Sequence, residues 1–411
     1  MNDGYVQHSR EPLRDVVATP EALAECVAAL AAGEGPVAFD AERAHGHRYW
    51  PKAYLFQIRR RGAGTWLVDP LPFEVDGAAH LADLGECCGD ALWLVHAASQ
   101  DLPCMRDAGV RPRHLFDTEL AARLLGEPSA GLASLLERKL GIRLEKAHSA
   151  DNWATRPLPE SWLDYAALDV DYLLELHEIL RDELDAIGRL SWAQEEFAAT
   201  LEQFSVAPAP RIDPWRRLTG VTSLKSPRQL AVARALWEER DTIARNRDRP
   251  PGRILPDPAI VELAQRVTQS GPLPGPVDLG TIRGFQNRAS QRYRSNWLRA
   301  IASVDGMATS NYPSRRPPSN GLPHPRNWDR HHPEAAELWW KVKPAVDELG
   351  CELAMQPSLV APPAIIQQVV FDHAEEPDFA AALRRLGARN WQVDFLAPLL
   401  DEVSERAQAV N

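Results

Sequence analysis

The sequence has few cysteines and no long apolar run. Its 411 residues include five cysteines, and no two of them have the Cys-x-x-Cys spacing that is typical of a zinc site. The odd number also argues against a disulfide framework, so we expect reduced and mostly buried thiols. No apolar stretch approaches the roughly 18 residues of a membrane span, and the polar first residues do not resemble a secretory signal. These absences favour a cytoplasmic protein that does not bind a membrane.

Positive charge is scarce overall, yet it is concentrated in one part of the chain. The formal net charge is −11, whereas residues 211–330 carry +11 and the rest of the chain therefore carries −22. Because phosphate contacts need lysine and arginine, this distribution favours a nucleic-acid-binding segment within an acidic protein. Arginine enrichment by coding bias is the alternative.

The length and the order of the expected elements indicate several domains. A chain of 411 residues exceeds what one hydrophobic core usually organises. Short strand-like runs and helical patterns alternate up to about residue 190, which predicts an α/β domain, and helical patterns dominate afterwards. We therefore expect a sheet-containing domain, a helical domain, a basic linker rich in proline, serine and arginine, and a second helical domain, at residues 15–205, 211–290, 291–330 and 331–411.

The strands of the first domain are expected in short apolar runs. Residues 59–64 contain two glycines and predict a hairpin turn between two of these strands. A long amphipathic helix is expected at residues 162–189. The strands themselves are predicted at residues 37–39, 54–58, 65–68 and 91–96.

Two carboxylates follow the first predicted strand. Asp40 and Glu42 are two positions apart, so on an extended chain their side chains point to the same face and can meet at one cation. The Asp-x-Glu pattern alone has little value in an acidic chain. Asp117 and Glu119 repeat it at the start of a helical pattern, where the two side chains face different directions.

Two further elements contain acidic residues in suggestive places. Asp101 lies where a buried strand runs into a helix start, and ligands bind at the carboxyl ends of such strands. An ordinary helix-start aspartate is the alternative. Tyr165 and Asp169 are four residues apart on a predicted helix and so share one face. Packing and solvation are the alternative for this pair.

Together these elements resemble the three exonuclease motifs of the DEDD superfamily, specifically its tyrosine subclass, which contains ribonuclease D. The similarity covers roughly residues 15–190 and extends to the flanking residues at 39–42, 96–102, 116–118 and 162–170. It implies a ribonuclease H-like α/β fold with a central mixed sheet, followed by all-helical domains. It also implies 3′-to-5′ exonuclease activity.

The resemblance further implies two divalent metal ions, Mg²⁺ or Mn²⁺, as cofactors. Such ions provide a nucleophile at neutral pH and relieve charge on the leaving oxygen, and they prefer oxygen ligands. By resemblance, Asp40 bridges both ions, Glu42 and Asp169 complete one ion, and Asp101 holds the other through water. Tyr165 would orient the attacking water, because a phenol with an ordinary pKa near 10 is a poor general base.

Residues 144–158 also resemble the ribonuclease D pattern. Trp153 and Arg156 either support the helix of the catalytic tyrosine or contact the terminal nucleotide, and both alternatives stay open. Lys146 and His148 could contact phosphate, although solvated loop residues are the simpler interpretation. The same two alternatives apply to the arginines at 59–61.

The basic middle resembles the HRDC domain, a small helical module shared by ribonuclease D and RecQ-type helicases. The similarity lies in residues 224–241, 246–251 and 254–257. No glycine in the chain is followed by lysine, so the phosphate loop of a helicase is missing. The C-terminal helical region resembles a second, diverged HRDC-like domain. The candidate RNA-binding residues of the basic middle are Arg217, Lys225, Arg228, Arg234 and Arg247.

We therefore expect a metal-dependent 3′-to-5′ exoribonuclease, acting as a monomer on the single-stranded 3′ tails of tRNA or other structured RNA. A DNA exonuclease with the same residues is one alternative, because nothing in the sequence reports on recognition of the ribose 2′-hydroxyl. An inactive nucleic-acid-binding scaffold is another. The complete carboxylate set argues against the scaffold, which would be free to lose any of these ligands.

Overall fold

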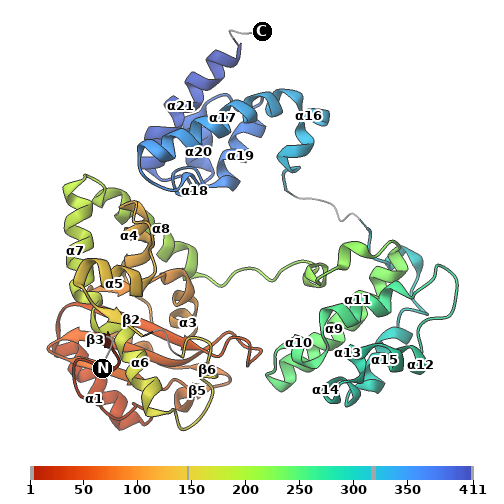
Figure 1. Ribbon diagram of the computed structural model, residues 1–411, viewed down its shortest axis with the longest axis horizontal. Helices are drawn as coiled ribbons and strands as arrows, with labels where there is room; N and C mark the ends of the chain where they lie inside the picture. Colours follow the sequence, from red (N-terminus) through yellow and green to blue (C-terminus); the bar gives the residue numbers. More distant parts are fainter. Residues whose placement is uncertain (1–3, 146–147, 316–320, 409–411) are drawn as a thin grey trace. The chain divides into compact units, whose positions relative to one another are not determined.

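The computed structural model describes residues 4–145, 148–315 and 321–408, and the chain forms two compact units (Figure 1). The first unit comprises Met1–Arg43, Ala53–Ala207 and Asn320–Asn411, and the second comprises Ala44–Lys52 and Pro208–Ser319. None of the helices in these described ranges combines the length and the apolarity that a membrane span requires.

The first unit is built on a five-stranded mixed sheet. Its strand order is β4-β3-β2-β7-β8, in which β2, β3 and β4 pair antiparallel and β2, β7 and β8 pair parallel. The α/β class with a central mixed sheet, as expected from the sequence, is confirmed. The strands span Glu34–Arg43 (β2), Ala53–Arg61 (β3), Gly64–Val68 (β4), Leu92–Val95 (β7) and His114–Asp117 (β8).

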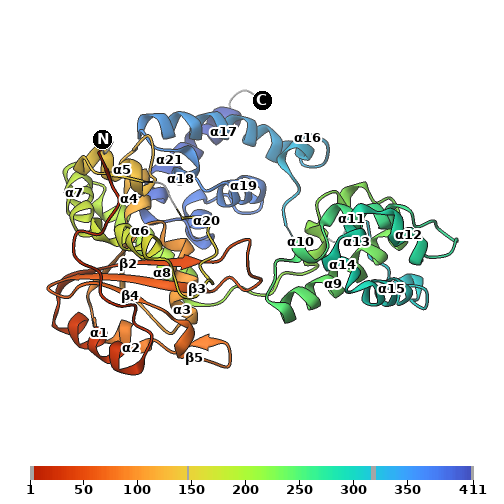
Figure 2. The same ribbon diagram turned by 60° about the horizontal axis from the view of Figure 1, so that its bottom comes forward.

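Helices cover both faces of this sheet. Helices α1 (Pro20–Ala32) and α2 (Ala82–Glu86) lie on one face, and α6 (Glu160–Asp171) and α7 (Leu173–Ala186) lie on the other (Figure 2). The Thr19 side chain accepts a hydrogen bond from the Ala22 amide and so caps α1. Phe39 packs against Phe56 and Trp93 in the core, with ring centroids 5.2 and 5.8 Å away. The middle of β2 is therefore buried, which fixes the backbone that leads into Asp40.

The predicted long helix at 162–189 is two helices, because the chain breaks at Tyr172 between α6 and α7. Asp171 at the end of α6 is fully buried. Its carboxylate accepts hydrogen bonds from the Ser9 hydroxyl, the Arg10 amide and the Thr65 hydroxyl at 2.9–3.0 Å. The end of α6 is thus attached to the N-terminal segment and to β4, while α7 runs on in a new direction.

The C-terminal residues of the first unit form a helical layer that packs on the sheet-containing part. It contains α17 (Pro333–Glu352), α19 (Pro363–Asp372), α20 (Phe379–Arg385) and α21 (Asn390–Gln408), and it shares one hydrophobic core with the sheet domain. Trp391 stacks on Trp192 of α8 (Leu190–Ser205) at 5.0 Å and donates a hydrogen bond to Glu196. The described C-terminal residues, 321–408, are therefore part of the same compact unit as the sheet.

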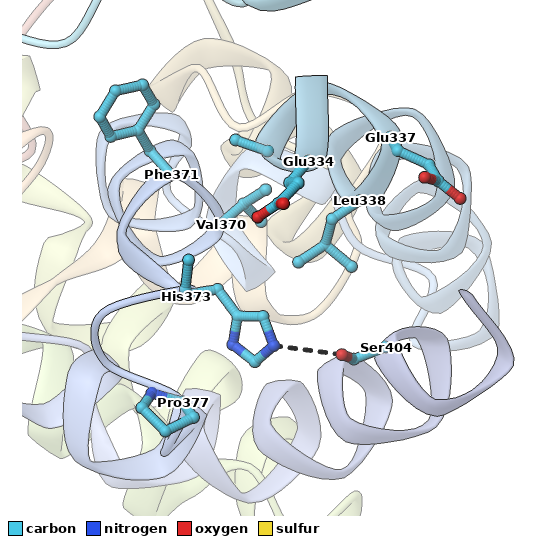
Figure 3. Close-up of a pocket in the computed structure, with 10 residues that line it drawn as sticks. Glu334, Glu337, Leu338, Val370, Phe371, His373, Pro377 and Ser404 are labelled. Carbon is cyan, nitrogen blue, oxygen red and sulfur yellow. Dashed lines mark hydrogen bonds between the residues drawn. The ribbon is translucent and has the colours of Figure 1, made fainter. Parts of the chain in front are cut away.

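A cavity of about 480 Å³ lies within this C-terminal layer (Figure 3). His373, whose Nε2 is 3.2 Å from the Ser404 hydroxyl, lines it together with Glu334, Glu337 and Leu338. None of the residues that the sequence singled out for catalysis lines this cavity.

The second unit is helical and has its own core. Helix α9 (Pro227–Arg247) begins with a capping box between Ser226 and Gln229, and α10 (Pro251–Ile254), α11 (Asp257–Gln265) and α15 (Arg294–Ala302) follow. Trp215 and Trp297 are buried in its core. Helix α15 falls inside the segment 291–330 that was expected to be a linker, so the linker prediction is wrong for these residues. The prediction relied on the high arginine content of the segment, and composition does not show that the apolar residues of α15 form one buried face.

Candidate active site

Three of the predicted carboxylates converge at the boundary between β2 and α6. Asp40, Glu42 and Asp169 each offer one ligand atom, and these atoms lie within 4.8 Å of one another. The first two residues share a face of β2 because they are two positions apart, and Asp169 comes from the helix packed on that strand. Strand alternation and helix packing thus produce a cluster with the geometry of a cation site.

This cluster has an excess of negative charge that the protein does not neutralise. Burial raises the pKa of Asp40, and burial together with the charges of Asp40, Asp169 and Asp101 raises the pKa of Glu42. The pKa of Asp169 is raised by burial and by Asp40. Among the described residues, Arg43 is the cation that acts against the shifts of Asp40 and Glu42. Hard oxygen ligands with unbalanced charge fit a divalent cation, which restores the ionised form of each carboxylate.

Asp101 lies next to the cluster but is not one of the three converging ligands. It is buried between a short 3₁₀ turn and helix α3 (Leu102–Asp107), and one of its oxygens is 3.9 Å from Arg43 Nη2. Burial raises the pKa of Asp101, and the charges of Asp40, Asp117 and Asp169 raise it further. Asp101 therefore interacts with the three carboxylates through its charge, although it is not among the ligand atoms that lie within 4.8 Å of one another.

Asp117 is a structural residue, as expected from its helix-start position. Its carboxylate accepts hydrogen bonds from the amides of Ala97, Ala98, Glu119 and Leu120 at 2.9–3.2 Å. Ala97 is in the left-handed region with a φ of 58°, a conformation that costs a non-glycine residue free energy. Asp117 thus stabilises the turn that leads to Asp101.

Tyr165 lies one helical turn before Asp169 on α6 and faces the carboxylates. Burial raises the pKa of its hydroxyl, and the charges of Asp169, Glu42 and Asp40 raise it further. The phenol therefore stays protonated at neutral pH. A protonated hydroxyl can donate and accept hydrogen bonds but cannot act as a general base.

For Trp153 and Arg156 the structure favours the supporting role over contact with a nucleotide. The Trp153 ring is fully buried, and its centroid lies 5.2 Å from the Trp162 ring and 6.3 Å from the Tyr165 ring. Arg156 donates to both carboxylate oxygens of Asp69 at 2.6 and 2.8 Å. It also donates to backbone carbonyls at Tyr54, Trp153 and Thr155. A fully buried ring has no surface on which a base could stack.

The candidates at 146–148 and at 59–61, the latter at the end of β3, were also expected to contact phosphate, and the described ones have partners within the first unit. His148 Nδ1 is 2.6 Å from Asp151, and Lys146 lies outside the described residues. Arg59 donates to Glu11 and Thr65 at 2.8 and 2.7 Å. Arg60 and Arg61 bond to Leu30 and to Glu178 respectively, so these arginines mainly hold the first unit together.

The five candidate RNA contacts of the second unit divide into two groups. Arg228 donates to the carbonyls of Thr268 and Gly271 at 2.9 and 2.7 Å, and Arg234 contacts Met307 and Asn311. These two arginines have structural roles. The other three are exposed, and no side-chain partner is found for them among the residues that the structure describes: Arg217, Lys225 and Arg247.

Sequence reasoning missed two residues of the site. Gln57 pairs directly with Asp40 across β2 and β3, so their side chains share a face of the sheet. It is fully buried, and neither amide atom has a hydrogen-bond partner among the described residues. Such an orphaned amide beside a carboxylate fits a site completed by bound water or a ligand. A polar residue inside an apolar strand was the available signal. Arg43, which follows Glu42, was the other omission.

Family models match three segments of the chain. The models are described as 3′-5′ exonuclease at residues 15–185, HRDC domain at residues 229–301 and 3′ to 5′ exonuclease C-terminal domain at residues 321–403. The sequence suggested an HRDC-like domain for the last region, and the matching model describes it instead as the C-terminal domain of an exonuclease.

Individual relatives extend over most of the chain. Ribonuclease D of Granulibacter bethesdensis is 30% identical over 317 residues, which cover 74% of this chain and 75% of the relative. A crystal structure of a protein from Bifidobacterium adolescentis aligns with 34% identity and a TM-score of 0.87, covering 98% of this chain and 99% of that one. Escherichia coli RNase D, an exoribonuclease involved in structured RNA processing, has the same fold at 24% identity and a TM-score of 0.67, covering 96% and 99%.

These matches coincide with the elements that carry the carboxylate cluster and with the helical second unit. The chain belongs to the ribonuclease D family of 3′-to-5′ exoribonucleases.

Proposed function

We propose that this exoribonuclease works with two divalent metal ions and trims the single-stranded 3′ tails of structured RNA, tRNA among them. The observation that carries the metal proposal is the convergence of Asp40, Glu42 and Asp169 with raised pKa values and too little compensating positive charge. The substrate class follows the relative from Escherichia coli, which acts in structured RNA processing.

The residues of the site would have different roles according to their positions. Asp40, Glu42 and Asp169 would hold the ions, with Asp101, which lies 3.9 Å from Arg43, contributing from beside the cluster. When bound, divalent ions supply a nucleophile at neutral pH and neutralise charge that develops on the leaving oxygen. Tyr165, protonated and next to Asp169, would orient the attacking water through its hydroxyl. Trp153 packs against Tyr165 and is itself packed against Trp162, so it would support the tyrosine.

The second unit would hold the RNA chain. Its residues carry a net charge of +12, whereas those of the first unit carry −23. Carboxylates repel phosphate, so affinity for a long RNA has to come from positive charge elsewhere. Exposed Arg217, Lys225 and Arg247 are the residues of the predicted set that are open to such contacts.

Digestion of 5′-labelled oligonucleotides tests this function. Single-stranded RNA, a hairpin RNA with a 3′ tail and the DNA of the same sequences are incubated with Mg²⁺, with Mn²⁺ and with a chelator. We expect a ladder that shortens from the 3′ end on RNA with metal and none with the chelator. The Asp40→Asn variant is the control for contaminating nucleases. Cleavage inside the RNA, or equal activity with the chelator, would overturn the proposal, and faster digestion of DNA would favour a DNA exonuclease.

A further inference from the structure

The loop between β2 and β3 belongs to the second unit, although both strands belong to the first. Residues Ala44–Lys52 follow Glu42 and Arg43 directly. The Asp248 carboxylate, just after α9, accepts hydrogen bonds from the Tyr49 and Trp50 amides at 3.0 and 3.2 Å. The Tyr49 hydroxyl donates to Asp241 at 2.9 Å. The loop is therefore held in one conformation against the end of α9.

This fixed loop presents an exposed tryptophan. The Trp50 side chain is 47% exposed, whereas Tyr49 beside it is partly buried and contacts the Trp50 ring edge-on with centroids 5.1 Å apart. Leaving a large aromatic ring in water forgoes the free energy that its burial would give. The backbone of Trp50 is rigidly bonded, so its exposure is a feature of the folded loop and gives a flat surface on which a base can stack.

A cationic cavity adjoins the loop within the same unit. It has a volume of about 200 Å³ and is lined by Gly46, His47, Arg249, Pro250 and Arg253. Both arginines are exposed. The nearby carboxylate of Asp248 is already engaged by the loop amides and lies 3.6 Å from Arg48 Nη1. The cavity therefore keeps a net positive charge and suits an anionic group such as a phosphate.

We infer that Ala44–Lys52 and the α9–α10 turn form a subsite for one nucleotide of single-stranded RNA, with phosphate in the His47, Arg249 and Arg253 cavity and a base stacked on Trp50. Aromatic stacking combined with backbone cations is the general way in which proteins bind single strands without reading sequence. Glu42 and His47 are five positions apart, which corresponds to a chain length of at most about 18 Å. The inference rests on the proposed function, because it assumes that RNA is the substrate.

Binding of a 5′-fluorescein single-stranded RNA to the full chain, followed by anisotropy in chelator so that no cleavage occurs, tests the subsite. Trp50→Ala is expected to weaken binding about fivefold to a hundredfold. The pair Arg249→Gln and Arg253→Gln is expected to lower the slope of log affinity against log salt by about 0.7, because both arginines contact the single phosphate of the subsite.

Matched controls separate the subsite from general effects. Trp340→Ala removes a tryptophan of similar exposure, 49%, from the first unit and should leave binding unchanged. Arg283→Gln with Arg292→Gln removes the same charge from exposed positions of the second unit, and it should leave the salt slope unchanged. An abasic RNA of equal length should bind to Trp50→Ala as tightly as to the wild type, since it has no base to stack.

The outcomes distinguish the subsite from the proposed function. If the wild type shortens RNA with metal but Trp50→Ala and the arginine pair bind RNA like the wild type, the subsite is wrong and the function stands. If the wild type does not shorten RNA, the function itself fails. Equal weakening of intact and abasic RNA by Trp50→Ala would overturn stacking, and equal effects of the two arginine pairs would overturn a localised phosphate site.

Discussion

The two units of the molecule differ in charge, in architecture and in what they contain. The first unit carries −23 and groups three half-buried carboxylates with the buried Asp101 beside the central strand β2, whereas the second carries +12 and consists of helices with exposed arginines. Metal binding requires concentrated negative charge, and phosphate binding requires positive charge. The two requirements conflict at one surface, so we infer that the chain separates chemistry and RNA holding into different units.

The two units also have separate hydrophobic cores. The core of the first contains the sheet, α7, α8 and the C-terminal helices, and the core of the second is built around Trp215 and Trp297. A chain ended after the sheet domain would lose Trp391 and its contacts with Trp192 and Glu196. Truncation would therefore disturb the first unit as well, and point substitutions are better tests of the difference between the two units.

The largest effect is expected from Asp40→Asn. It should lower the rate of RNA shortening by about a thousandfold or more, because a metal site supplies several kcal/mol of transition-state stabilisation and each 1.4 kcal/mol is a factor of ten. It should also raise the melting temperature in chelator, since Asp40 raises the pKa of Glu42 and Asp169 by repulsion. RNA binding by the second unit should persist. Retained activity would remove Asp40 from the site.

Trp297→Ala should destabilise the second unit selectively. The side chain is buried, and its Nε1 donates to the Ser290 carbonyl at 2.9 Å. Replacing a buried tryptophan by alanine typically costs about 3–5 kcal/mol. Urea denaturation followed by circular dichroism should show a transition that moves to lower urea, while cleavage of a short oligonucleotide continues. If the activity falls with that transition, the two units do not fold independently.

Tyr165→Phe should reduce turnover about a hundredfold, the cost of misplacing a reacting group by about 1 Å. Metal binding and RNA affinity should stay as in the wild type, because the carboxylates and the second unit are untouched. Steady-state kinetics, combined with anisotropy for RNA and calorimetry for metal, separates these quantities. Full activity in the variant would show that the hydroxyl does not orient water.

Acidification should weaken the first unit through His177. This side chain is buried against Phe116, and burial, followed by the charge of Arg181, lowers its pKa to about 4. The unfolded chain binds the proton near pH 6.5, so the stability from this group is present above pH 6.5 and is lost as the pH falls toward 4. Between pH 7 and 5 the wild type should lose roughly 2 kcal/mol more than His177→Phe in urea denaturation. Equal losses would mean that His177 is protonated in the folded state.

The smallest effect is expected from neutralising the exposed cations of the second unit. Replacing the three residues by glutamine should lower the salt slope of RNA binding by about 2, at about 0.7 per contact, and leave cleavage of a short oligonucleotide intact. The residues are Arg217, Lys225 and Arg247. A control triple in the first unit should leave the slope unchanged: Arg111, Arg113 and Arg181. Equal slopes for both triples would favour coding bias as the origin of the basic segment.

Local spacing predicted which carboxylates of the candidate site lie close together. The two-residue alternation of a strand put Asp40 and Glu42 on one face, and the helical repeat put Tyr165 above Asp169. The structure brings Asp40, Glu42 and Asp169 together as these spacings suggested. Such inferences work because backbone geometry repeats over a few residues and does not depend on the rest of the fold.

The sequence by itself determined which residues form the motifs and how the charge is distributed along the chain, because both depend only on residue types and short spacings. The tertiary structure alone decided which polar side chains are available: it buried Trp153, engaged Arg156 and Arg228 in carbonyl and carboxylate contacts, and left Trp50 exposed. It also placed residues 320–411 on the sheet domain and Gln57 beside Asp40. The burial of a side chain and its hydrogen-bond partners depend on segments that are far apart in the chain, so a local sequence pattern cannot predict them.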